Sequence, residues 1–231
     1  MIFLSMVFCV FHALAFVQTE VLTARICRRE TSRALNEIKF SFEKLFSLNS
    51  SAELLRTRWL ALEAQIIAAE ALLPESLPAL TILLQQKAVL LIQRQQLDHT
   101  QKFILNSIDL QSLNFRSQIS LALKSYKSSG VLNYKLSNLQ IYTLQSGIAF
   151  PDIPDIAPVY GLHPQWNQKA YVSVSWNERQ TSEDSWISGN LEKLEWNSGC
   201  SFALGAKPIG LVPQLQVVAR ALSRDRLLLR R

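Results

Sequence analysis

The stretch "LTILLQQKAVLLIQRQQLDHTQKFIL" (residues 80–105) decides the helical part of the fold. Four apolar residues recur at intervals of seven: Leu83, Leu90, Leu97 and Ile104. This period predicts one long helix from about Leu77 to Tyr126. Polar residues take the second position of the repeat, where a regular coiled coil has apolar ones: Lys87, Arg94 and Gln101. We therefore predict a helix interface formed by the four apolar residues, through antiparallel packing inside the chain. A separate partner helix is the alternative.

Two further helices are predicted before this one. The first carries an apolar face at helical spacing: Leu35, Ile38, Phe42, Leu45 and Phe46. The segment "SLNSS" (residues 47–51) then offers Ser or Asn as the N-cap of a second helix. That second helix has its own apolar stripe: Leu55, Trp59, Leu62, Ile66, Ala69 and Leu73. It is expected to end at "LLPESLP", where Pro74 and Pro78 interrupt the pattern.

After Gly130 the period changes from helical to extended. "VLNYKLSNLQIYTL" (residues 131–144) is typical of a strand, and "KAYVSVSW" (residues 169–176) alternates with Val172, Val174 and Trp176 on one face. Shorter runs follow in "SWISGNLEKLEWN", "CSFALGA" and "PQLQVVARAL". The intervening "FPDIPDIAPVYGLHPQWN" has four prolines and no periodicity, which predicts an extended surface loop. The last third is thus predicted to be a small antiparallel sheet.

The predicted fold class is α+β, in three parts. Residues 1–24 form a signal or transmembrane anchor, residues 25–128 a helical hairpin or bundle, and residues 129–231 a small β-rich domain with a basic C-terminal tail. The formal net charge is +6, and the tail contributes five arginines against one aspartate. We found no motif for sequence-specific nucleic-acid binding beside this charge, so none is predicted.

The sequence predicts no enzyme. It contains no phosphate-binding glycine loop, no nucleophile elbow and no metal-ligand spacing, so catalytic residues, cofactors, metals and a small-molecule substrate are all predicted to be absent. The three cysteines fit no zinc or redox motif. Cys27 and Cys200 can pair if the body is exported, but the position of Cys27 beside the predicted membrane boundary disfavours that pairing.

The N-terminal segment "MIFLSMVFCVFHALAFVQTE" indicates membrane targeting. It has no charged side chain from Met1 to Val17, yet its apolar run of about 16 residues is shorter than the roughly 20 that span a bilayer. Ala13 and Ala15 form an A-x-A signal-peptidase site, although a basic n-region is missing. Cleavage after Ala15 would leave Phe16 first and Glu20 fifth, as in type IV pilins. In pilins, however, the apolar stretch follows that glutamate, so pilin-type cleavage is rejected.

A third interpretation rests on residues 1–40. "MIFLSMVFCVFHALAFVQTEVLTARICRRETSRAL" resembles the N-terminal region of tight-adherence (Tad) pilus-assembly proteins, in which one apolar helix passes into a basic amphipathic helix. The resemblance implies an uncleaved anchor whose basic start lies upstream of Met1, and it carries no catalytic residues. The basic residues Arg25, Arg28 and Arg29 follow the apolar run, and the positive-inside rule would place that side in the cytoplasm. The orientation therefore stays open.

We expect a structural or assembly protein of the bacterial cell envelope, single-pass in the inner membrane with a periplasmic body, or periplasmic or secreted after cleavage. Its membrane boundary or processing site is predicted at Ala13, Ala15, Phe16 and Glu20. Its expected partners are the membrane, through the N-terminal helix, and other envelope or pilus-assembly proteins, through protein–protein interaction. The alternative is a periplasmic or secreted module that binds a ligand on the Trp-rich β domain.

Overall fold

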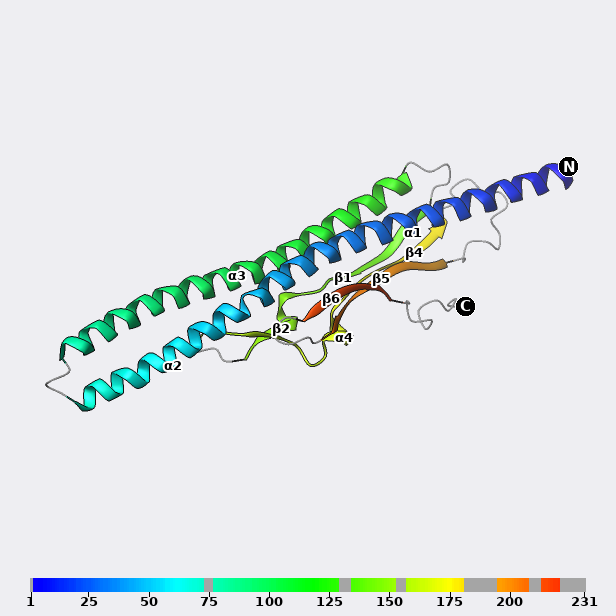
Figure 1. Ribbon diagram of the computed structural model, residues 1–231. Coiled ribbons are helices and arrows are strands. Elements are labelled where there is room, and N and C mark those ends of the chain that lie inside the picture. The colour runs from blue at the N-terminus through cyan, green and yellow to red at the C-terminus, as the bar shows by residue number, and fades with distance from the viewer. Residues whose placement is uncertain are drawn as a thin grey trace.

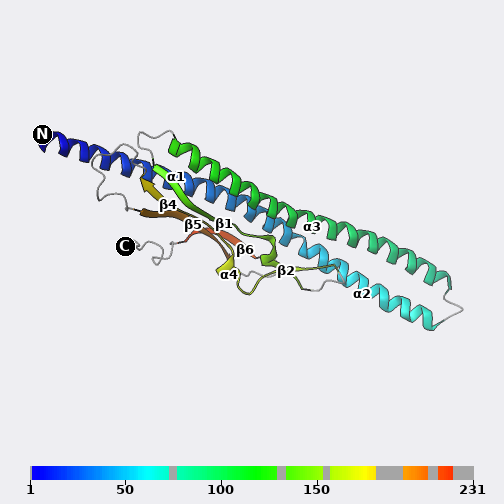
Figure 2. The same ribbon diagram turned by 180° about the vertical axis from the view of Figure 1, so that it is seen from behind.

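The fold combines long helices with a small antiparallel sheet, as the sequence predicts. The computed structural model describes residues 2–72, 77–128, 134–152, 157–180, 195–207 and 213–220. Figure 1 shows two helices, α1 and α2, following one another as a rod, with α3 returning alongside and the sheet against one side. The view from behind gives the same arrangement (Figure 2).

Helix α1 spans Ile2–Ser47 and α2 spans Asn49–Ala71. The apolar face predicted for the first helix, from Leu35 to Phe46, is completely buried. The predicted Ser or Asn cap of α2 is wrong, because the N-cap is Leu48, which keeps right-handed helical angles and makes no side-chain capping bond. The carbonyl of Leu48 accepts a bond from the amide of Ala52 at 3.0 Å. The backbone therefore stays nearly helical between α1 and α2. The Asn49 side chain bonds the backbone of Tyr160 instead of capping α2.

Helix α3 spans Leu77–Ser128 and runs antiparallel to the rod (Figure 1). Its seam toward the rod includes the polar residues of the heptad repeat. The ammonium of Lys87 lies 3.4 Å from a carboxylate oxygen of Glu63 and 5.1 Å from the ring centroid of Trp59, both on α2. Gln101 is fully buried and donates from Nε2 to the carbonyl of Pro158 at 2.9 Å. Lys87 and Gln101 thus have polar partners within the same chain, which allows them to lie in the seam.

The sheet has the strand order β1-β4-β5-β6, all antiparallel. The strands are β1 (Tyr134–Tyr142), β4 (Tyr171–Gln180), β5 (Glu195–Lys207) and β6 (Gln214–Ala219). The alternation predicted for β4 is confirmed, since three side chains on one face are buried: Val172, Val174 and Trp176. Cys200 and Leu204 of β5 and Leu215 of β6 continue this inner face. One hydrophobic core thus joins the sheet to α1 and α3.

The proline-rich segment is not the extended surface loop that the sequence predicts. It begins within β2 (Ala149–Pro151), which pairs with β3 (Tyr160–Leu162), and it ends in helix α4 (Trp166–Lys169). The 3₁₀ turn η1 (Ser146–Ile148) lies just before it. Asn49 bonds both backbone groups of Tyr160, at 2.9 Å each. Side chains of the helices thus satisfy the backbone around Pro158 and Tyr160, which allows Ala157, Pro158 and Tyr160 to be buried.

Candidate functional site: the disulfide-locked junction of α1 and β5

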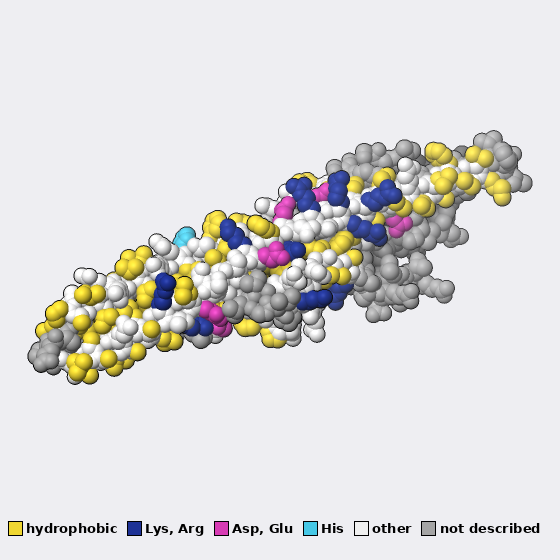
Figure 3. All heavy atoms as spheres, viewed as in Figure 1, with side chains coloured by type: hydrophobic (Ala, Val, Ile, Leu, Met, Phe, Trp, Pro, Cys, Tyr) yellow, Lys and Arg dark blue, Asp and Glu magenta, His cyan; other side chains and the backbone are white. Residues whose placement is uncertain are grey.

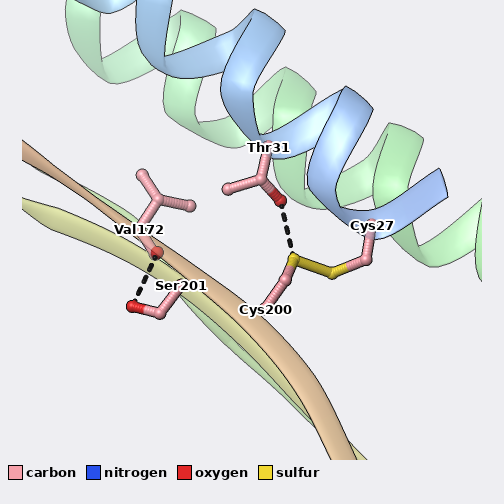
Figure 4. The surroundings of a disulfide bond; sticks show 5 residues. All are labelled: Cys27, Thr31, Val172, Cys200 and Ser201. Atoms are coloured by element: carbon pink, nitrogen blue, oxygen red, sulfur yellow. Dashed lines mark hydrogen bonds between the residues drawn. A yellow bond between two sulfur atoms is a disulfide. The ribbon is translucent and has the colours of Figure 1, made fainter. Parts of the chain in front are cut away.

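The middle of α1 is fixed to the sheet by a disulfide bond between Cys27 and Cys200 (Figure 4). The two Cα atoms lie 6.1 Å apart, within the range of ordinary disulfides, and the residues are 0% and 4% exposed. The disfavoured pairing is therefore present. Helix α1 continues unbroken past the predicted membrane boundary and lies across β5, so Cys27 faces the sheet.

Polar side chains of α1 line the same contact on either side of the disulfide. The hydroxyl of Thr31 lies 3.3 Å from the sulfur of Cys200 (Figure 4). One α1 turn before Cys27, Thr23 is fully buried. Glu20 accepts a bond from the hydroxyl of Ser198 on β5 at 2.8 Å. These spacings of three and four residues put one face of α1 against β5 for about three turns.

The predicted membrane-boundary residues lie in one continuous helix. Ala13 is exposed, and Ala15 and Phe16 belong to α1, although their side chains are outside the described part. Glu20 is half-buried and bonded to the sheet. Before Glu20, six large apolar side chains are more than half exposed: Met6, Val7, Val10, Phe11, Leu14 and Val17. Among the described side chains of α1, Glu20 is the first that is bonded to the sheet, and the apolar segment projects beyond it (Figure 1).

The predicted helix interface on α3 is divided between two environments. Leu97 and Ile104 are 8% and 3% exposed, because the rod and the sheet domain enclose them. Leu83 and Leu90 are half-buried and flank Lys87, whose contacts with Glu63 and Trp59 mark the side facing α2. All four residues thus lie along the seam, which is less enclosed toward the end of the hairpin.

Ser198 and Thr31 were missed by reasoning from the sequence. Serine and threonine in isolation give no signal, and their role depends on the register that brings β5 to α1.

The basic C-terminal tail lies outside the described residues apart from Arg220, whose guanidinium stacks 4.6 Å from the ring centroid of Tyr171. Tyr171 in turn stacks on Tyr142, with centroids 4.4 Å apart. Burial and the neighbouring Tyr171 raise the pKa of Tyr142.

The described residues offer little chemistry beyond this junction. They contain no group of three or more His, Cys, Asp or Glu side chains arranged to hold a metal ion. An open groove of about 790 Å³ lies between α1 and α3, lined by residues that include Arg29, Arg33, Phe40 and Gln111. Two of the four tryptophans of the Trp-rich β domain, Trp166 and Trp176, are 2% and 1% exposed, and Trp186 and the side chain of Trp196 lie outside the described part. Trp166 donates from its ring nitrogen to the carbonyl of Leu204 at 2.7 Å and packs edge-on against Phe42.

Comparisons with known proteins give no match: no protein-family model, no curated protein and no solved structure is similar to this chain. Within the described ranges, no helix is both long enough and apolar enough to cross a membrane.

Proposed function

We propose that this protein is a structural or assembly component of the bacterial cell envelope, with its body on the oxidising side of the inner membrane. The observation that carries the proposal is the Cys27–Cys200 disulfide. Disulfides persist in the periplasm and outside the cell, whereas the cytosol keeps thiols reduced. The bond joins the segment next to the apolar N-terminus to the middle of the sheet, so the whole body shares one compartment.

The apolar start of α1 supports attachment to the membrane. Residues 2–17 carry no charge, and the described side chains among them leave large apolar surfaces exposed. An exposed apolar surface of this kind marks a membrane or protein contact. Arg25, Arg28 and Arg29 follow directly and are exposed. They would resist export by the positive-inside rule, so the disulfide and the arginines favour opposite orientations. The proposal follows the disulfide, because disulfides are rare in cytosolic proteins, whereas the positive-inside rule is a statistical bias.

The shape favours assembly over catalysis. Helices α1 and α2 contain 46 and 23 residues, which at 1.5 Å per residue makes a rod of about 105 Å. A rod with an apolar start at one end and a helical hairpin at the other suits a part that reaches away from a membrane to other proteins. Tad-like pilus assembly is the finer form of this proposal, and it rests on the resemblance of residues 1–40.

The proposal is tested by the accessibility of an exposed site on α2. A Cys9→Ser, Gln65→Cys variant of the full chain, produced in bacteria, is treated with a membrane-impermeant maleimide in spheroplasts. We expect labelling without lysis, equal to that after lysis. Labelling only after lysis would place the body in the cytoplasm and overturn the proposal. The mass of the same protein distinguishes an intact anchor from cleavage before Phe16, and a variant lacking residues 2–17 is expected to lose its membrane attachment.

A further inference from the structure

Helix α3 carries a second heptad stripe on the side opposite its seam. Two series of positions interleave in it, each with an interval of seven residues. One series is 82, 89, 96, 103 and 110, and the other is 85, 92, 99, 106 and 113. Six of the ten positions from 82 to 113 are large apolar residues: Ile82, Val89, Ile92, Phe103, Leu110 and Leu113. Each of these six side chains is between 53% and 67% exposed. We call residues at these ten positions the outer stripe.

The outer stripe has the composition of a helix interface. Its four remaining positions are uncharged polar residues: Gln85, Gln96, His99 and Asn106. A solvent-facing helix stripe normally carries charges, as α3 does nearer its C-terminal end with Lys102, Arg116 and Lys124. Leu84 and Leu91, exposed outside the outer stripe, extend its apolar surface. Exposed apolar side chains are also visible over the hairpin end of the molecule in Figure 3, where α2 and α3 have no third helix against them. The sheet does not extend over this end of the hairpin (Figures 1 and 2).

We propose that the outer stripe binds the same stripe of a second copy, with the two α3 helices parallel. Self-pairing requires a surface without like charges, and the ten positions contain no Lys, Arg, Asp or Glu. Glutamine and asparagine have both donors and acceptors, so each can bond its own copy across a two-fold axis. Polar residues at such positions can also fix the register of a helix pair, at some cost in stability.

The parallel direction follows from which residues meet. In a parallel pair each position faces itself, so all six apolar residues meet apolar residues and the polar ones meet polar ones. In an antiparallel pair centred on the stripe, Val89 would meet Asn106 and Leu110 would meet Gln85. Those contacts would bury amides against apolar groups without partners, which is costly.

The length of the stripe is sufficient for a stable pair. Residues 82–113 extend for about 47 Å at 1.5 Å per residue. With the flanking positions the stripe supplies close to the 20 residues a side that specific interfaces use. The flanks are mostly uncharged as well, with Ala88, Gln93 and Thr100 among them. The inference does not depend on the compartment of the body, so it stands or falls separately from the proposed function.

The pairing is tested by the mass of the purified, oxidised full chain in mild detergent, measured by sedimentation equilibrium. We expect twice the 26.2 kDa of one chain. Val89→Glu and Phe103→Glu should each weaken the dimer by about thirty-fold or more, as loss of a central interface residue does. The matched controls Leu60→Glu and Ile67→Glu change equally exposed residues on α2 and should leave the dimer unchanged. Circular dichroism verifies that each variant stays helical.

The orientation is tested by cross-linking. In a Cys9→Ser background, Gln85→Cys should form a covalent dimer on mild oxidation, because parallel helices bring position 85 next to itself. In an antiparallel pair, the two copies of residue 85 would lie about 37 Å apart, 25 residues at 1.5 Å. Gln65→Cys on α2 is the control and should not cross-link. A monomeric wild-type chain, or a dimer unaffected by the α3 substitutions, would overturn the pairing. A dimer without the position-85 cross-link would overturn its parallel form.

Discussion

Removing the disulfide is expected to destabilise the whole body. Cys27 and Cys200 are 173 residues apart in the chain, so the bond closes a very long loop in the unfolded state. The chain-entropy relation for a loop of that length gives about 5 kcal/mol at 25 °C, an upper value because unfolded chains keep some structure. The variant Cys27→Ala, Cys200→Ala should therefore lose about 3–5 kcal/mol of unfolding free energy.

Urea unfolding followed by tryptophan fluorescence measures this loss, because Trp166 and Trp176 are both buried in the core that the disulfide adjoins. With a urea dependence of about 2 kcal/mol per molar, the midpoint should fall by roughly 1.5–2.5 M. Wild-type protein treated with a reductant should fall by a similar amount. Cys9→Ser is the matched control and should unfold like the wild type. An unchanged midpoint for both the double variant and the reduced wild type would refute this reasoning.

Three further changes test the interior. Asn49→Leu removes both partners of the buried Tyr160 backbone and should cost about 2–4 kcal/mol in urea unfolding, whereas Ser50→Ala, at an exposed neighbour, should cost little. Trp166→Phe leaves the carbonyl of Leu204 without its donor and should cost about 1–3 kcal/mol; a neutral result would mean that this bond adds nothing. Burial, helped by Asp98 and opposed by Lys102, raises the pKa of Tyr160 above its ordinary 10.0. The folded state then keeps the proton longer than the unfolded state, so stability should fall above about pH 10, and Tyr160→Phe should reduce that fall.

The helices and the main strands could be predicted because their patterns are local. The seven-residue interval of Leu83 to Ile104 gave the extent of α3, and strict alternation gave the buried face of β4. These periods reflect which side of an element is buried, because apolar residues recur along the sequence at the interval of the buried face. The prediction of the α2 N-cap was wrong because of a tertiary contact. Asn49 has the side chain of a good cap, but a segment more than a hundred positions later uses its amide.

The junction of α1 and β5 could not be predicted, because its parts come from the two ends of the chain. Nothing near Cys200 in the sequence identifies Cys27 as its partner, and Ser198 meets Glu20 only through the register of β5. The buried position of "FPDIPDIAPVYGLHPQWN" is of the same kind. Its prolines and lack of period are local signs of a loop, whereas the burial of Pro158 and Tyr160 depends on hydrogen bonds with Gln101 and Asn49.

The state of the two cysteines in living cells tests the central claim most directly. Intact bacteria producing the full chain are quenched with acid, and the free thiols are then alkylated. The protein is digested without reduction and examined by mass spectrometry. A body on the oxidising side of the membrane predicts a linked pair of peptides that contain Cys27 and Cys200, with neither thiol alkylated. Recovery of both residues as alkylated thiols would show a reducing environment and contradict the account.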